Sequence, residues 1–495
     1  MRTPVPVRRR SLPRTTAAVV GVVAIVAGAT SAGARTPPNP NVAADAAAVL
    51  AGVKGASLLV ADPASGCMAG PSPQPVAIRS ERILVRTAER DDGVVGALAA
   101  NPSFAAAGFT GTPSIVARLS PPGPGGLVPV VVVDLGLAAV HAPQVLTLVR
   151  GLRAAGLEAS PDYALSPSGG PIGMWPYGPP EPTGAPLPAP RRARIGRGVT
   201  IALYDTGVPI DRFGANAPAN IDELSGIDKL DRNADGVADL PYDGHTIAVA
   251  SVVNTLAPAA DVYVVRIMDD SGVATDSSAA TSVISSFSDR FVADFPPGFA
   301  PDVLLMPFGT PACDGLPPLA LQAVTAGIVA SGRSLIVASA GNRGEDRPFY
   351  PAAFDGVVAV GSLDLTGDRD GSAWTSPTRA GPRSAFSNYG PWVDAWAGGE
   401  RLVTNHIAGL SFYDGGPMLD GVAEVSGTSY AAPAVAALIA EGVSRTGRPA
   451  GWVWRHLLRP SGTRCPASGG GVAVALTALD EPFSEQAEHV RRSPC

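Results

Sequence analysis

The chain has 495 residues, of which only 16 % are charged, and its formal net charge at pH 7 is −6. This length predicts two or three domains with a large buried core. The negative balance gives no reason to expect a nucleic-acid partner, and the abundance of Gly (57) and Pro (50) fits a loop-rich secreted protein better than a charged cytosolic one.

Residues 1–34 have the pattern of an export signal. Three arginines at 8–10 form a positive region, an apolar run covers 17–27, and small residues at 32–34 offer a cleavage site. The apolar run is shorter than the roughly 20 residues that a spanning helix needs, which favours removal over a retained anchor. We therefore expect a secreted protein, extracellular or periplasmic, with no stable membrane anchor in its mature form; the export route, Sec or twin-arginine, stays open.

Residues 35–168 predict a separate small α+β unit. Residues 82–86 alternate like a strand, and 130–134 form an apolar run typical of a buried strand. Helical spacing covers 145–155, and a last strand-like stretch covers 157–165.

Residues 169–195 are rich in Pro and Gly and predict an exposed linker. From Gly198 onward, short apolar runs of strand length alternate with helical stretches. The expected strands cover 199–204, 262–267, 303–306, 335–338 and 357–360, and the expected helices include 246–256 and 319–330. This alternation predicts an α/β fold with a doubly wound parallel sheet. In such a sheet the working residues gather at the carboxyl ends of the strands.

The four cysteines fit an oxidising compartment; they are Cys67, Cys313, Cys465 and Cys495. Their spacing leaves the pairing open, and we favour Cys465–Cys495, which would tether the C-terminus. Zinc is not expected, because no two cysteines lie at metal-ligand spacing.

Ser429 lies where a Gly-Thr turn gives way to an apolar helical run over 430–439. A serine in a first helical turn is close to unpaired backbone N–H groups and the positive end of the helix dipole, which favour negative charge developing at a nucleophile. An N-cap cluster before a core helix is the alternative for Gly-Thr-Ser alone. The whole string from Val425 to Pro433, however, resembles the nucleophile motif Ser-Gly-Thr-Ser-x-Ala-x-Pro of subtilisin-like serine peptidases.

Two further motifs of that family lie upstream. Asp205-Thr206-Gly207 directly follows an expected strand and resembles the aspartate motif, and Ser339-Ala340-Gly341-Asn342 resembles the oxyanion-hole motif. Each by itself would be an ordinary turn. The order Asp205, His245, Ser429 is the subtilisin order, unlike those of chymotrypsin and the α/β-hydrolases. A lipase or esterase would also need Gly-x-Ser-x-Gly, which Ser429 lacks.

His245 is assigned partly by elimination. The family pattern is His-Gly-Thr-His-Val-Ala-Gly, and this chain reads His-Thr-Ile-Ala-Val-Ala-Ser from His245 to Ser251. Among the five histidines, only His245 and His406 lie within the region of the motifs and away from the tail, and only His245 opens an apolar helix.

The resemblance covers about 198–462 and implies specific roles. Ser429 would attack a peptide carbonyl, His245 would take and return its proton, and Asp205 would orient the imidazole, while Asn342 would donate its amide to the tetrahedral intermediate. No cofactor would be required for this chemistry, and proteins or peptides would be the substrates. The family also implies that 35–168 is a propeptide that inhibits its own peptidase domain (169–462, followed by a tail at 463–495), with processing in or just before 169–195.

Two features bear on the substrate. Where the family has Ser-Leu-Gly along one side of its cleft, this chain has Pro307-Phe308-Gly309, so the edge loses one N–H and gains bulk, and we expect altered or narrowed specificity. Arg343 either lies at the rim of the first specificity pocket, favouring acidic or polar side chains, or is a solvated loop arginine.

The stretch 231–239 matches the first nine places of an EF-hand-type calcium loop. The expected oxygen ligands are Asp231, Asn233, Asp235, the carbonyl of Val237, and Asp239. Position twelve is Tyr242 in place of the usual Glu, and an acidic surface turn is the alternative. Structural calcium is thus one hypothesis for this stretch.

The leading hypothesis for the function of the whole chain is a secreted, self-processing endopeptidase. The alternative is a catalytically impaired peptide-binding or surface protein of the same fold.

Overall fold

The computed structural model divides the chain into two compact units, 1–37 and 38–495, and every described residue belongs to the second. The described residues are 58–60, 76–123, 127–136, 142–167, 176, 179–208, 221–223, 234–238, 242–268, 272–286, 300–313, 315–364, 383–458, 463–464 and 472–473. The predicted export signal and three of the four cysteines lie outside them. Among the described residues, no helix is both long and apolar enough to cross a membrane.

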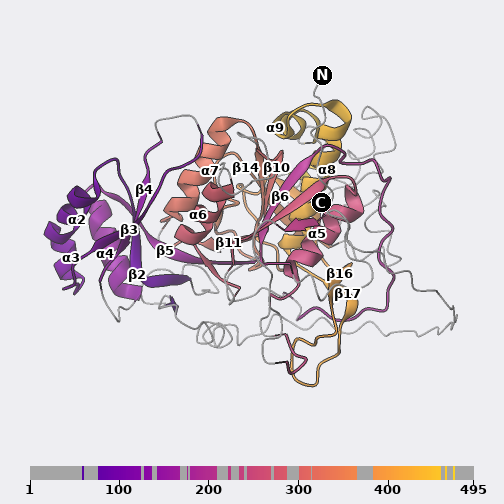
Figure 1. Cartoon of the computed structure of the whole chain (residues 1–495), viewed down its shortest axis with the longest axis horizontal. Helices are drawn as coiled ribbons and strands as arrows, with labels where there is room; N and C mark the ends of the chain where they lie inside the picture. The colour runs from indigo at the N-terminus through magenta and orange to yellow at the C-terminus, as the bar shows by residue number, and fades with distance from the viewer. Residues whose placement is uncertain are drawn as a thin grey trace. The chain divides into compact units, whose positions relative to one another are not determined.

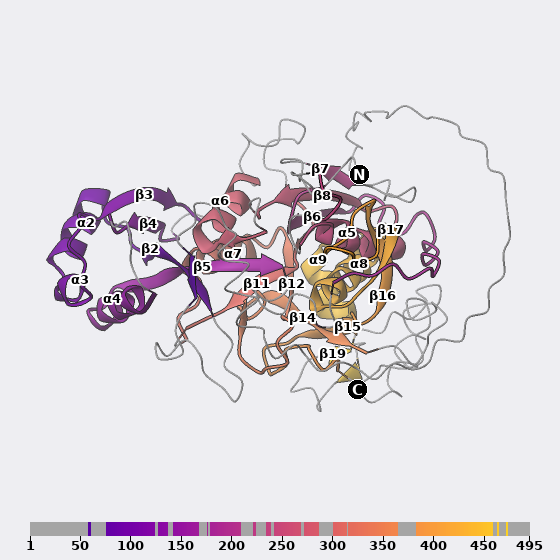
Figure 2. The same ribbon diagram turned by 90° about the horizontal axis from the view of Figure 1, so that it is seen from below.

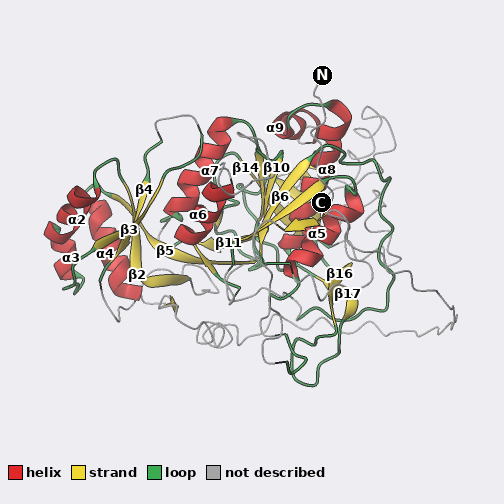
Figure 3. Ribbon diagram, viewed as in Figure 1, coloured by secondary structure: helices red, strands yellow, loops and turns green. Residues whose placement is uncertain are grey.

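The larger sheet is parallel apart from one edge hairpin. Its strands β6, β10 and β14 are labelled beside the helices α5 (His245–Leu256) and α8 (Thr428–Thr446) in Figures 1 and 3. In the described residues its strand order is β18-β19-β15-β14-β12-β10-β6-β8-β7. The strands are β6 (Thr200–Asp205), β7 (Ile221–Glu223), β8 (Asp261–Arg266), β10 (Val303–Met306), β12 (Leu335–Ser339), β14 (Val357–Leu363), β15 (Ala395–Gly398), β18 (Thr463–Arg464) and β19 (Val472–Ala473). The doubly wound sheet predicted from the sequence is confirmed.

Two apolar layers cover the faces of this sheet. Ile201 and Leu203 share one layer with the helices α5 and α8. Their neighbours Ala202 and Tyr204 belong to the opposite layer, with α6 (Asp276–Ser286) and α7 (Leu319–Ser331). Because alternate side chains of a strand point to opposite faces, near-continuous apolar strands are what a sheet covered on both sides requires.

The N-terminal segment, residues 76–167, contributes the strands β2, β3, β4 and β5 to a second, antiparallel sheet. Its elements are β2 (Ala77–Arg86), α2 (Asp91–Ala100), α3 (Pro102–Ala106), β3 (Ser114–Leu119), β4 (Val130–Asp134), α4 (Ala142–Ala154) and β5 (Glu158–Pro167), and β1 (Leu58–Val60) pairs with β2. One face packs on α2–α4. Leu84 and Val132 on the other face share the layer of α6 and α7, so the sheet lies between two sets of helices (Figure 2).

The remaining elements lie around the carboxyl ends of the central strands and at the end of α8. They are β9 (Ala274–Thr275), β11 (Phe308–Pro311), β13 (Phe349–Tyr350), the hairpin β16 (Leu402–Ala408) and β17 (Asp420–Val425), α9 (Ala450–Val453), and a π-helical turn at Trp454–Leu458. Two of these strands, β11 and β13, join the sheet of the N-terminal segment, whose strand order is β13-β11-β5-β2-β4-β3. The two parts of the chain therefore share one continuous sheet.

The structure differs from the sequence prediction mainly at the ends of elements. The last strand of the N-terminal segment was expected over 157–165 and reaches Pro167, because Ser166 and Pro167 pair with β11. The strand expected over 199–204 includes Asp205, which pairs with Arg266. Both extensions depend on partners that are distant in the sequence, which local periodicity does not reveal.

Candidate active site

Asp205 and His245 are in direct contact at the end of β6 and the start of α5. Nδ1 of His245 lies 2.8 Å from both carboxylate oxygens of Asp205. The Asp205 side chain is fully buried and that of His245 is 4 % exposed. A buried carboxylate that holds Nδ1 selects the imidazole tautomer whose Nε2 can accept a proton.

The residues that follow Asp205 and His245 hold the two elements together. The hydroxyl of Thr246 donates to the carbonyl of Thr206 at 2.6 Å, and the two threonine hydroxyls lie 2.9 Å apart. Thr246 is one of the departures from the family's histidine motif. Here its hydroxyl links α5 to the end of β6, so this substitution supports the Asp205–His245 geometry.

His406, the other candidate from the sequence, lies behind the site. Its ring is 1 % exposed and packs edge-on against Phe412, with 5.7 Å between ring centroids. A Cβ on Gly244, the residue before α5, would lie 2.7 Å from Cε1 of His406. Burial, followed by the charge of His245, lowers the pKa of His406 to about 3. Its Nδ1 has no hydrogen-bond partner among the described residues, so this neutral, enclosed imidazole is a structural group.

Ser429 is fully buried and is the second residue of α8, as the sequence predicted. Its Oγ donates a hydrogen bond to the carbonyl of Pro307 at 2.8 Å. The ring of Tyr430, the next residue, lies 5.5 Å from the ring of His245, which brings the start of α8 beside the histidine. Nε2 of His245 is buried and has no hydrogen-bond partner among the described residues.

Asn342 is oriented by Thr428, the residue before Ser429. Oδ1 of Asn342 accepts hydrogen bonds from the backbone N–H of Thr428 at 2.8 Å and from its hydroxyl at 2.9 Å. The same hydroxyl accepts from the N–H of Gly341 at 3.0 Å. Since the carbonyl end of the Asn342 amide is fixed in this way, only its NH₂ end can donate to another group.

Asn388 fixes the loop that carries Asn342. Its Nδ2 donates to the carbonyl of Ala340 at 2.9 Å, and its Oδ1 accepts from the N–H of Arg343 at 2.9 Å. Its own N–H donates to the carbonyl of Gly341. The sequence marked the segment around Asn388 as a family landmark without a role. In the structure this side chain holds the loop on both sides of Asn342.

The edge formed by Pro307, Phe308 and Gly309 is occupied by β5. Phe308 pairs with Pro167 and Gly309 with Ser166 in antiparallel register. On its other side β5 pairs with β9, Ala164 opposite Thr275. The ring of Phe308, expected to add bulk at this edge, is buried in the apolar layer that also contains Leu165 of β5. An extended chain thus lies between two edges, as in peptide recognition by strand addition.

A sequence model of the subtilase family (Peptidase S8) matches residues 196–459, more than half of the chain. The chain belongs to the subtilase family. It is 30 % identical over 251 residues to a thermophilic serine proteinase of Bacillus sp. (strain AK1), covering 49 % of this chain and 51 % of that protein. Thermitase of Thermoactinomyces vulgaris is 28 % identical over 249 residues, covering 49 % of this chain and 73 % of thermitase.

This subtilase therefore spans about half the length of the Bacillus proteinase that it matches. Among solved structures, that of a cold adapted subtilisin-like serine proteinase is 25 % identical, with a TM-score of 0.41, and the match covers 58 % of this chain and 91 % of that one.

The sequence leaves Arg343 open between a pocket-rim residue and a solvated loop arginine, and in this subtilase it is half-buried beside Asn342. Burial lowers the pKa of its guanidinium to about 10, and the charge of Glu345 acts in the opposite direction. The guanidinium thus stays charged at neutral pH. A contact between the Arg343 guanidinium and a substrate side chain stays a prediction.

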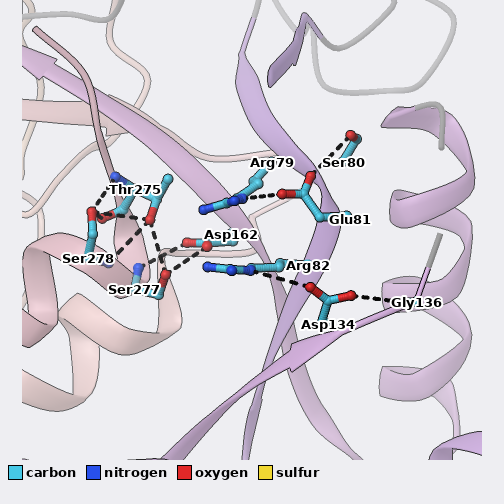
Figure 4. Close-up of polar contacts among 10 residues, drawn as sticks. All are labelled: Arg79, Ser80, Glu81, Arg82, Asp134, Gly136, Asp162, Thr275, Ser277 and Ser278. Carbon is cyan, nitrogen blue, oxygen red and sulfur yellow. Dashed lines mark hydrogen bonds and ion pairs between the residues drawn. The ribbon is translucent and has the colours of Figure 1, made fainter. Parts of the chain in front are cut away.

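Asp162 of β5 docks on the first turn of α6 (Figure 4). Its carboxylate accepts from the backbone N–H of Ser277 at 2.9 Å and from the Ser277 hydroxyl at 2.7 Å. The guanidinium groups of Arg79 and Arg82 point toward it (Figure 4). Burial raises the pKa of Asp162, while Ser277 and then the two arginines lower it. No sequence motif indicated this contact.

A second carboxylate lies next to it. Asp276 accepts from the N–H groups of Ala320 and Leu321, at the start of α7, at 3.0 and 2.8 Å. Burial, followed by the charge of Asp162, raises the pKa of Asp276 to about 8. Each of the two helices therefore has its first N–H groups bound by a buried carboxylate, one from each part of the chain.

Most of the predicted calcium loop lies outside the described residues, including Asp231, Asn233 and Asp239. The two described candidates, Asp235 and Val237, contact each other: the carboxylate of Asp235 accepts a hydrogen bond from the N–H of Val237 at 2.8 Å. Ser411 holds this part of the loop by backbone hydrogen bonds to Gly236 and Ala238. No group of three metal-ligating side chains occurs within the described part of the chain. Calcium binding stays a prediction.

Cys313 is disulfide-bonded. It is the one cysteine among the described residues, so its partner is one of the other three. The favoured Cys465–Cys495 pair stays a prediction.

Proposed function

We propose that this chain is a secreted serine endopeptidase made as a self-processing proenzyme. The observation that carries the proposal is the position of β5: an extended chain occupies the edge that begins at Pro307, whose carbonyl accepts a hydrogen bond from the hydroxyl of Ser429. The Asp205–His245 contact and the orientation of Asn342 supply the groups that peptide hydrolysis needs around this nucleophile.

In the proposed reaction, Ser429 Oγ turns from Pro307 toward His245 and attacks the peptide carbonyl while Nε2 of His245 takes its proton. The carbonyl oxygen gains negative charge, and the NH₂ of Asn342 donates to it. The C–N bond then breaks, and His245 returns the proton to the leaving amine. Water attacks the acyl-enzyme with His245 again as base, which releases the acid and restores Ser429.

We infer that residues 35–168 act as the propeptide and intramolecular inhibitor of the domain at 169–462. Support comes from three kinds of contact on the described part: the β5–β11 pairing, the shared apolar layer of Leu84 and Val132 with α6 and α7, and the hydrogen bonds of Asp162. A strand held along the cleft excludes other peptides from the same edge.

The pairing register points to the bond that is processed. Gly309 faces Ser166 and Phe308 faces Pro167, so β5 ends at Pro167, opposite the residue that follows Pro307. Since the carbonyl of Pro307 holds the nucleophile, we propose that the bond between Ser168 and Gly169 is cleaved. The mature chain would then begin at Gly169, at the start of the predicted linker.

The second candidate function is a subtilase-fold protein that binds peptides without cleaving them. One observation favours it: Ser429 Oγ is hydrogen-bonded to Pro307, and Nε2 of His245 has no partner among the described residues. The hydrogen bond between a catalytic serine and its histidine often forms only when substrate is in place. If Ser429 instead stayed hydrogen-bonded to Pro307, the protein would not react with peptides.

The deciding experiment is intact-mass analysis of the secreted protein and its Ser429→Ala variant, each with and without a fluorophosphonate probe. We expect the wild type to lose residues up to 168 and to take up one probe, and the variant to keep its N-terminal segment and take up none. Loss of residues 1–34 from both proteins would support export and signal removal. An unprocessed, unlabelled wild type would favour the peptide-binding protein.

A further inference from the structure

Phe349 is the first residue of β13 and is fully buried. Its ring belongs to neither of the apolar layers that the described residues form on the main sheet. It lies instead against two glycines. A Cβ added to Gly309 would lie 2.5 Å from Cε1 of Phe349, and one added to Gly341 would lie 3.0 Å from Cγ.

These two glycines flank the reaction centre. Gly309 belongs to the edge that pairs with β5, two residues after the Pro307 carbonyl that holds Ser429. Gly341 precedes Asn342, and its N–H donates to Thr428. The ring of Phe349 therefore stands between the edge on which a substrate backbone lies and the loop that carries the oxyanion donor.

The side chain next to an attacked carbonyl has to enter this space. The backbone of that substrate residue runs along Pro307 to Gly309, as β5 does, while the carbonyl oxygen of the same residue has to reach Asn342. The side chain is then directed between the strand edge and the loop at 340–342. A rigid ring that already fills this space leaves room for a small group and excludes a second aromatic ring.

The chain's own processing segment fits this limit. From Ser166 to Gly170 the sequence reads Ser-Pro-Ser-Gly-Gly, so no bond within this stretch has an aromatic or large aliphatic residue on its acyl side. Leu165, the nearest large side chain, is fully buried in the apolar layer with Phe308.

We propose that Phe349 closes the primary specificity pocket of this enzyme, which therefore cleaves after glycine, alanine or serine and not after aromatic or large aliphatic residues. The inference rests on the proposed peptidase function. Phe349 acts as a specificity-determining residue: it limits the volume available to the substrate and takes no part in proton transfer.

The test uses internally quenched peptides that contain Ala-Leu-Ser-Pro-X-Gly-Gly, the sequence of 164–170 with X at position 168. The processed enzyme is first titrated with the fluorophosphonate probe, and kcat/KM is then measured for X = Gly, Ala, Ser, Leu and Phe. We expect X = Ala or Ser to exceed X = Leu or Phe by tenfold or more. Phe349→Ala should raise the Phe-to-Ala ratio of kcat/KM by at least another tenfold, since apolar groups that fit a pocket discriminate by about 10- to 200-fold.

Phe354→Ala is the matched control. Phe354 is a buried ring that contacts Tyr350 at 4.7 Å and belongs to the layer of α7, so its removal should lower stability and leave the wild-type ratio unchanged. A labelled wild type that cleaves X = Phe as fast as X = Ala overturns the pocket proposal, even if Phe349→Ala does not fold. A protein that neither takes up the probe nor cleaves any peptide overturns the peptidase function itself.

Discussion

Asp162 and Ser277 are 115 residues apart and form two hydrogen bonds, through which the last strand of the N-terminal segment caps the first turn of α6. The carboxylate is entirely buried, and Asp276, which caps α7, lies beside Ser277 in the chain. Two buried acids of like charge thus meet where the proposed propeptide docks. The docked state is consequently sensitive to protonation.

We predict that the processed N-terminal segment is held at acidic pH and released as the pH rises toward 8. The pKa of Asp162 is raised by burial in the docked state, and that of Asp276 is raised to about 8, partly by the charge of Asp162. An acid whose pKa rises on docking takes up a proton, so docking is strongest below its ordinary pKa and weakens as the pH rises toward the docked value.

Gel filtration of the processed protein between pH 5 and 9 measures this directly. Asp162→Asn keeps an acceptor for Ser277 and removes the charge, so co-elution of the two parts should depend less on pH. Ser277→Ala should weaken docking by a similar factor at every pH. Equal co-elution of the wild-type parts at pH 5.5 and pH 8.5 would contradict the prediction.

We predict that Thr428→Val lowers kcat by about tenfold and leaves KM nearly unchanged. The variant loses the hydroxyl that binds both Asn342 and Gly341, while the backbone N–H still holds Asn342. Asn342→Ala, which removes the donor itself, should cost about 10²- to 10³-fold in kcat. Thr325→Val is a matched control, because this buried hydroxyl donates to the carbonyls of Leu321 and Gln322 in its own helix, α7. Wild-type kcat in Thr428→Val would show that the hydroxyl does not position the donor.

We predict that His406→Leu makes the protein less sensitive to acid. The pKa of His406 is lowered to about 3 by burial, so between about pH 6.5 and pH 3 the unfolded chain binds a proton that the folded chain does not. Stability is therefore lost as the pH falls through this range, by about 2 kcal/mol at pH 5. Melting temperatures at pH 7 and pH 5 should differ less in His406→Leu than in the wild type. The exposed His456, replaced by Gln, should keep the wild-type difference. Equal differences in all three proteins would refute the assignment.

We predict that a calcium chelator lowers the melting temperature of the wild type but not that of Asp235→Asn. Asp235 is the described carboxylate of the loop, and calcium that binds only the folded chain stabilises it. Asp355→Asn, an exposed carboxylate far along the chain from this loop, should respond to the chelator as the wild type does. A wild-type melting temperature that the chelator does not move would leave the loop an acidic surface turn.

The parallel sheet, the place of Ser429 in the first turn of α8, and the places of Asp205 and Asn342 at or just after strand ends could be predicted from the sequence alone. These features follow from apolar periodicity and from short contiguous motifs, which depend on neighbouring residues alone. His245 could also be assigned from the sequence, partly from its incomplete motif and partly by elimination.

Which of these groups meet, and which residues support them, depends on contacts between distant segments of the folded chain. Thr428 reaches Asn342, Phe349 fills the space between Gly309 and Gly341, and Thr246 joins Thr206 across segments that no local pattern links. The pairing of Ser166 with Gly309 depends on strand order and register between separate parts of the chain. Such contacts arise because folding brings distant segments together at one sheet edge, and the register there is selected by the packing of both partners at once.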